Sequence, residues 1–155
     1  MARYSSNNDL GGVQQAISGT FKTLLSLTAE TATLTNAKVY DVLFGTNGTP
    51  ADNFLEYDIS RQTAAGTATA VLPVLIDPGN RAAGSIAEAN YTAEGTITAA
   101  SSLFFIGVNQ RASYRWVANP GSELIIPAVD ENGVAFRALS AGYTGTATCT
   151  MMHEE

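Results

Sequence analysis

Short segments of alternating polarity, separated by Gly, Pro and Asn, run through almost the whole chain. The clearest is FLEYDISRQ at 54–62, in which Leu55, Tyr57 and Ile59 alternate with polar residues. A period of two indicates a half-buried β-strand, because successive strand side chains point to opposite sides. The segment Asp-Pro-Gly-Asn at 77–80 is typical of a turn, since Pro fixes φ and Gly and Asn accept left-handed backbone. These patterns predict a fold built from strands.

The series of strand segments predicts an all-β fold. Only 82–91 could form a helical turn or two, and a succession of short strands favours a β-sandwich or barrel. With about eight strands, a jelly-roll-like single domain is the natural arrangement, although another sandwich topology is also open. The strands are expected within 20–29, 37–45, 54–62, 91–98, 102–110, 112–119, 123–128, 134–142 and 145–152.

The beginning of the chain has a different character. Residues 1–18 are rich in Ser, Asn and Gly and show no apolar period. They are expected to form an extended N-terminal arm that orders against a neighbour, with the β-sandwich domain at 19–155. The polar start also lacks the apolar centre of a signal peptide. No apolar stretch reaches the ~18 residues of a membrane span.

Composition restricts the partners. The chain of 155 residues has a net charge of −6 and no run of Lys or Arg, which disfavours nucleic acid and anionic membranes. Charged residues make up only 14% of the chain. A surface of Thr, Ser, Ala and Gly costs little to desolvate when another protein covers it. This composition favours a subunit of an assembly.

The residues that most often perform catalysis or bind metals are scarce. His153 is the one histidine, lies in MMHEE and is expected to be a solvated tail residue. Cys149 is the one cysteine, so no intrachain disulfide is expected, and its alternation with Thr residues predicts an inert, buried strand thiol. One His and one Cys cannot complete a zinc site. We therefore expect no catalytic residue, cofactor or metal, and no enzyme.

Carboxylates offer weaker alternatives. Glu56 and Asp58 share one face of a strand, as a glycosidase pair might, but that face is expected to be the polar, solvated one. The turn at 77–80 could supply oxygens to calcium, yet turn formation alone explains its residues. Asp130 and Glu131 are expected in a hairpin turn, because DENG ends in a dipeptide typical of tight hairpins.

Two aromatic pairs bear on binding. Phe104 and Phe105 are adjacent on a strand, so one ring must leave the primary core and pack under a loop or meet a partner subunit. Tyr114 and Trp116 share one face of YRWV. A buried core position is the preferred interpretation of this second pair, and a sugar-stacking platform is the alternative.

Five segments carry a resemblance to a known family: MARY at 1–4, FKTLLSLTAETATLTNAKVYDVLFGTNG at 21–48, SRQTAAGT at 60–67, IDPGN at 76–80 and YRWVANPGSELIIPA at 114–128. Together they resemble the capsid decoration, or cement, proteins of tailed bacteriophages. The resemblance implies a trimeric β-sandwich that sits on the outer capsid lattice and stabilises it against internal pressure. The longer polar stretch after MARY departs from the family pattern.

The expected function is therefore adhesion to the major capsid protein and to further copies of this chain as a homotrimer, on the virion exterior after synthesis in the host cytoplasm. The alternative is a carbohydrate- or receptor-binding module of a phage head fibre or tail, with an enzyme third. The small side chains of 62–70 would allow close approach to another subunit, whereas a flexible surface loop is the simpler interpretation. Expected capsid-binding residues are Arg3, Tyr4, Leu10 and Val13; expected subunit-interface residues are Thr63, Gly66, Thr67, Thr69, Phe104 and Phe105.

Overall fold

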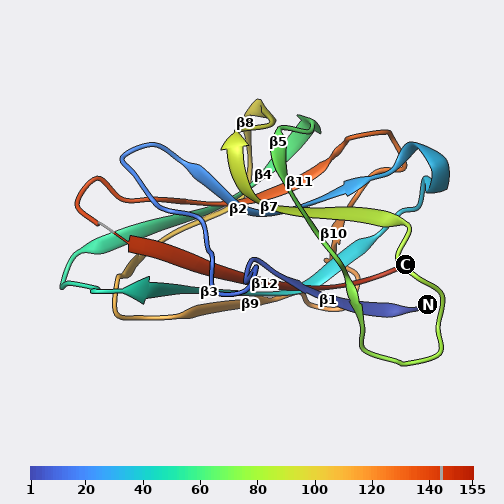
Figure 1. The fold of residues 1–155 in the computed structure, drawn as a ribbon. Helices are drawn as coiled ribbons and strands as arrows, with labels where there is room; N and C mark the ends of the chain where they lie inside the picture. Colours follow the sequence, from blue (N-terminus) through green and yellow to red (C-terminus); the bar gives the residue numbers. More distant parts are fainter. Residues whose placement is uncertain (144) are drawn as a thin grey trace.

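The computed structural model describes residues 1–143 and 145–155, and strands make up most of it (Figure 1). One short 3-10 turn spans Thr31–Thr33. No helix of the described residues is long and apolar enough to cross a membrane. The strands are β1 (Arg3–Asn7), β2 (Lys22–Ala29), β3 (Lys38–Gly48), β4 (Phe54–Ala64), β5 (Thr67–Val71), β6 (Val74–Leu75), β7 (Ser85–Ala93), β8 (Thr96–Asn109), β9 (Tyr114–Val117), β10 (Leu124–Ile125), β11 (Gly133–Leu139) and β12 (Gly145–Glu154).

The strands form two sheets that pack face to face as a β-sandwich, and the sequence-based prediction of that fold is confirmed (Figure 1). Sheet A has the order β10-β3-β12-β1-β6, with β9 also paired to β3. Sheet B has the order β5-β7-β2-β11-β4-β8. Every ladder between named strands is antiparallel.

The connectivity is that of a jelly roll. Four strands of sheet A, in the order β1-β12-β3-β9, face four strands of sheet B, in the order β2-β11-β4-β8. Along the chain these eight strands alternate between the sheets, except for β4 and β8, which follow each other in sheet B. Strands β5, β6 and β7 form an insertion between them. This insertion lengthens both sheets and explains why the turn signals are unevenly spaced.

The core lies between the two sheets and is centred on aromatic rings. Phe44 of β3 stacks on Tyr57 of β4 with ring centroids 4.6 Å apart, and Phe136 of β11 lies 6.4 Å from Phe44. All three side chains are fully buried. Cys149 is buried beside them, as predicted, and burial raises the pKa of its thiol. Large rings from both sheets thus join the two layers.

The prediction of an N-terminal arm is wrong. β1 lies inside sheet A between β12 and β6, and it places Tyr4 opposite both His153 and Leu75. Tyr4 is fully buried, and its hydroxyl donates to the carbonyl of Arg81 at 3.0 Å. The sequence pattern did not predict this strand. Its second inward-facing residue is Ser6, so the strand has no alternation of apolar and polar residues. The domain boundary at 18/19 is wrong for the same reason, since β1 is the first strand of the jelly roll.

The predicted helical turn at 82–91 is also wrong, because this segment contains most of β7. Ala87 and Ala89 alternate inward and are buried, while Ile86 and Glu88 point to the other side. Ala has a high helix propensity, but pairing on both sides, with β2 and β5, holds this segment extended. Tertiary pairing therefore decided the conformation.

Candidate interaction surfaces

Sheet A turns one side away from the core, and exposed apolar side chains lie on it; we call this side the outer face. Leu43, Val74 and Val117 are 45%, 60% and 56% exposed. They come from three strands, β3, β6 and β9, so they span the width of the sheet. One cross-strand row of this face consists of Val74, Ser5, Met152, Asp41 and Val117.

The charge in the middle of the outer face is paired. Arg115 donates from Nε to Asp41 at 2.9 Å, and the Asp41 side chain is only 8% exposed. A shallow hollow of about 240 Å³ lies beside this pair and is also lined by Leu43, Thr150 and Met152. Apolar side chains and hydroxyls cost little to desolvate, and a pair already formed costs less to cover than two unpaired charges. The outer face is therefore suited to contact with another protein surface.

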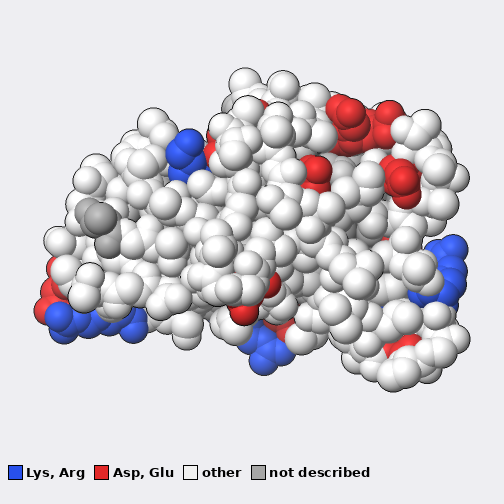
Figure 2. Space-filling view, in the orientation of Figure 1, with Lys and Arg blue, Asp and Glu red and all other residues white. Residues whose placement is uncertain are grey.

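A second surface is the free side of β8, which ends sheet B. The strand TITAASSLFFIGVN contains no charged residue and no proline. Leu103 and Phe105 are 42% and 57% exposed on it. Figure 2 shows how few charges lie on one side of the whole molecule, where uncharged residues cover most of the surface and the largest group of acidic side chains lies at the upper right. A long uncharged edge of this kind is a template for pairing with a further strand.

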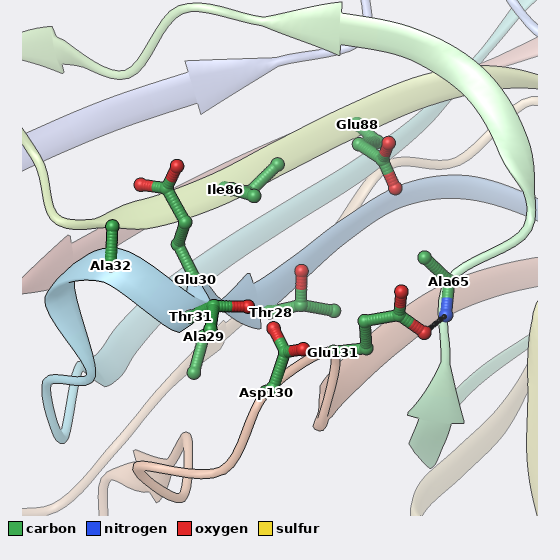
Figure 3. A pocket seen from close by; sticks show the side chains of 10 residues that line it. All are labelled: Thr28, Ala29, Glu30, Thr31, Ala32, Ala65, Ile86, Glu88, Asp130 and Glu131. Atoms are coloured by element: carbon green, nitrogen blue, oxygen red, sulfur yellow. Dashed lines mark hydrogen bonds between the residues drawn. The ribbon is translucent and has the colours of Figure 1, made fainter.

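A third feature is an acidic hollow of about 410 Å³ between the turn after β2, the start of β7 and the loop before β11 (Figure 3). The carboxylate of Glu131 is turned to the backbone N–H of Ala65 at 3.2 Å. Glu88 accepts from the hydroxyl of Tyr91 at 3.3 Å. No basic side chain lines this hollow, so it repels phosphate groups. Its lining residues are Thr28, Ala29, Glu30, Thr31, Ala32, Ala65, Ile86, Glu88, Asp130 and Glu131.

The loop at this hollow corrects one turn prediction. Asp130 and Glu131 do lie in a turn, and Glu131 has a positive φ of 56°. The turn connects β10 of sheet A to β11 of sheet B, however, so it is not a hairpin turn. Among the described residues, no group of three or more His, Cys, Asp or Glu side chains could hold a metal ion.

His153 is not a solvated tail residue, and that prediction is wrong. β12 continues to Glu154, and the imidazole is fully buried against Tyr4, with ring centroids 5.0 Å apart. Its Nε2 lies 3.3 Å from the hydroxyl of Ser85 and 3.7 Å from the carboxylate of Glu155. Sequence reasoning missed this cluster. The signal was present, because His153 continues the inward alternation of Cys149 and Met151.

The cluster of Ser85, His153 and Glu155 has the residue types of a nucleophile, a base and an acid, but not their geometry. In a catalytic triad the hydroxyl and the carboxylate contact opposite nitrogens of the imidazole. Here both approach Nε2, while Nδ1 is buried without a hydrogen-bond partner among the described residues. Ser85 is 6% exposed and His153 is fully buried, so substrate has no access to them. The cluster connects the two sheets.

The residues predicted to bind a capsid do not form one surface. Tyr4 is buried, which rules it out as an anchor, and Leu10 is half-buried against the core. Arg3 is exposed and pairs with Asp77 at 2.9 Å. Val13 is 60% exposed, and its carbonyl accepts from the amide of an asparagine on β7. Only Arg3 and Val13 remain open to a partner.

The predicted subunit-interface residues divide into two groups. Gly66 does allow a close backbone approach, but within its own chain, because an added Cβ would lie 2.2 Å from the carbonyl oxygen of Ala93. Phe104 faces inward and stacks on Tyr114 at 5.5 Å, so its place in an interface is a wrong prediction. The residues that do lie exposed are Thr63, Thr67, Thr69 and Phe105.

The other candidate binding residues are structural. Tyr114 and Trp116 both pack against the core, as preferred above, so they form no sugar-stacking platform. Asp58 shares a face with Glu56, but it is buried rather than solvated, because Arg137 donates to it at 2.9 Å. Comparison of the chain with protein-family models, with curated proteins and with solved structures finds no match.

Proposed function

We propose that this chain is a non-enzymatic structural protein of a virion, which decorates and cements a phage capsid by binding the lattice of the major capsid protein as a homotrimer. The observation that carries the proposal is the outer face of sheet A, a broad apolar area whose central charge is neutralised within the chain. The resemblance of the sequence to capsid decoration proteins supplies the particular partner.

The chemistry of the outer face favours adhesion over recognition of a small molecule. Its exposed valines and Leu43 lie on a sheet that is open across several strands, where a second protein surface could rest. Each such contact is modest, since apolar burial contributes about 25 cal/mol per Å² before the costs of association. Three copies held together and bound to a fixed lattice multiply that contact by avidity.

The proposal is tested with heads of the encoding virus prepared without this protein. Binding of the wild-type chain is measured by co-sedimentation, and attachment is expected to change little with salt, because Arg115 and Arg3 on this face are already paired with Asp41 and Asp77. The double variant Val74→Lys, Val117→Lys places two charges on the outer face and is expected to abolish attachment. Val129→Lys is the matched control, since Val129 is 53% exposed outside that face and should leave attachment unchanged. Undiminished binding of the double variant would refute the proposal.

A further inference from the structure

The main chain of β8 has donors and acceptors on its free side. Gln110, which follows the strand, donates its N–H to the carbonyl of Asn53 at 2.8 Å, toward β4. In an antiparallel ladder, successive residues direct their main-chain groups alternately to one neighbour and to the other. Between Phe104 and Gln110, the even-numbered residues therefore direct their main-chain N–H and C=O groups to β4. The residues that direct their N–H and C=O to the free side are Phe105 and Gly107.

In the described structure, the part of this free side from Phe104 to Asn109 lacks the charges, prolines and bulges that protect an edge strand. Soluble proteins block exposed edges with Lys, Pro, bulges that bend the strand away, or a covering loop. β8 has neither charge nor Pro over its 14 residues. Its bulges lie opposite Ile59–Ala64, so the ladder from Phe104 to Asn109 is regular. The exposed ring of Phe105 adds apolar surface that a paired strand would cover.

The opposite end of sheet B offers a second uncharged edge. β5 pairs with β7 on one side only, and its sequence TATAV contains no charged residue. Thr67, Thr69 and Ala70 are exposed along it. Figure 1 shows β5 rising above the body of the sandwich, where a further strand has access to it. Because each copy has a net charge of −6, two copies repel each other least where both surfaces are uncharged.

We propose that the free side of β8 pairs with β5 of a second copy of this chain, so that sheet B continues from one subunit to the next. Two different edges meet in such a heterologous contact, which forms a ring when the rotation from one copy to the next closes and an open filament when it does not. The homotrimer of the proposed function requires the ring. The inference rests on the homotrimer of the proposed function and identifies the strands that hold it together. It also explains why the Ala/Thr tract after Gly66 has small side chains, because the exposed ring of Phe105 would lie across them.

The test on β8 uses Gly107. An added Cβ there meets nothing within 4 Å, so Ala has room, and the ring of Pro would take the place of the N–H that points to the free side. Gly107→Pro removes a donor from the free side and leaves the ladder to β4 unchanged, because edge strands tolerate Pro at such a position. Size-exclusion chromatography with light scattering is expected to show trimers for the wild-type chain and for Gly107→Ala, and monomers for Gly107→Pro. A melting curve checks that the Pro variant is folded.

The test on β5 uses Ala70, which is exposed opposite Glu88 of β7. Ala70→Lys introduces a charge that pairing would have to desolvate, whereas Glu88 offers it a partner within the subunit. Ala70→Lys is expected to be monomeric and Ala70→Ser trimeric. An equimolar mixture of Gly107→Pro and Ala70→Lys should form 1:1 dimers, because one variant retains β5 and the other retains β8.

The outcomes separate this inference from the proposed function. A trimer that both variants leave intact overturns the pairing of β8 with β5 but retains the homotrimer. Loss of assembly with Gly107→Pro alone, and not with Ala70→Lys, also overturns this pairing, since β8 then meets another segment. A wild-type monomer that still sediments with capsids overturns the pairing and leaves adhesion to the capsid in place.

Discussion

Ser85 donates its hydroxyl to the buried carboxylate of Glu155 at 2.5 Å, and this hydrogen bond joins the beginning of β7 in sheet B to the end of β12 in sheet A. The same carboxylate accepts from the backbone N–H groups of Gly84 and Ser85 at 2.7 and 2.9 Å. Three donors thus converge on one side chain at the corner where Tyr4 and His153 are also buried. The two layers of the sandwich are held together here by polar contacts.

This arrangement predicts a pH dependence of stability. Burial alone would raise the pKa of Glu155, but His153, the Ser85 hydroxyl and the two backbone N–H groups outweigh it and lower the pKa to about 2. A pKa below its unfolded value of ~4.3 means that the ionised carboxylate stabilises the folded state. That contribution is complete above the unfolded value and is lost as the pH falls through the folded one. The free energy of unfolding should therefore decline between pH ~4.5 and ~2.

Urea unfolding at a series of pH values measures this decline. Glu155→Gln is expected to lower stability at neutral pH and to flatten the curve below pH ~4.5, because the amide does not titrate. Glu154→Gln is the matched control, since Glu154 is half-exposed on the other side of β12 and should retain the wild-type slope. An unchanged slope in Glu155→Gln would show that another group dominates acid unfolding.

Tyr4→Ala tests the place of β1 in the fold. Truncating a fully buried aromatic side chain is expected to cost about 3–5 kcal/mol, because it leaves a cavity beneath β1, beside the ring of His153. Arg3→Ala, one residue earlier on the exposed side, should change the free energy of unfolding by less than about 1 kcal/mol. Chemical denaturation of both variants decides the matter. A mobile N-terminal arm would give the same stability for both.

The sequence predicted most strands because their alternation is strong, and it failed where polar residues point inward. The segment 54–62 lies within β4, and Leu55, Tyr57 and Ile59 are all buried. β1 has the same period of two, but Tyr4 is its only large inward residue among polar neighbours, so the sequence pattern did not predict a strand there. The number of strands favoured a jelly roll but left other sandwich topologies open. The insertion of β5, β6 and β7 could not be predicted, because local patterns do not specify which strands pair.

The surfaces were harder to predict than the fold. Alternation showed that Phe104 and Phe105 face opposite sides, but which ring is exposed depends on the phase of β8 against β4. Asp58 was expected in solvent because a polar residue opposite a core residue usually faces water. Its face is instead covered, and Arg137, which brings the compensating charge, is 79 residues away in sequence. Contacts between residues far apart in the sequence therefore determine which of these side chains are buried and which are exposed.

Gln62 gives a prediction of increased stability. Its side chain is buried, and neither its amide nitrogen nor its oxygen has a hydrogen-bond partner in the described part of the chain. Gln62→Met keeps a similar volume and removes the unpaired polar atoms, so the free energy of unfolding should rise by about 1 kcal/mol. Gln110→Met is the control, because Gln110 is equally buried but accepts from Ala51 at 3.0 Å. The free energy of unfolding of Gln110→Met should fall by about 1–3 kcal/mol. If both substitutions destabilise the protein, the Gln62 side chain does not have the unpaired polar atoms described above.

Asp58 and Arg137 provide the last prediction, which concerns a buried ion pair. Asp58 accepts from Arg137 at 2.6 and 2.9 Å, and their side chains are 3% and 17% exposed. Asp58→Ala leaves a largely buried guanidinium unpaired, which should cost about 3–5 kcal/mol.

Asp52 and Arg111 form the matched exposed pair, with side chains 74% and 60% exposed, so Asp52→Ala should cost at most about 1 kcal/mol. The double variant Asp58→Leu, Arg137→Leu is expected to recover a large part of the loss, because it removes both charges and leaves none unpaired. Urea denaturation of the wild-type chain and the three variants provides the comparison. If the double variant is as unstable as Asp58→Ala, the lost stability comes from packing around Asp58 and not from an unpaired charge.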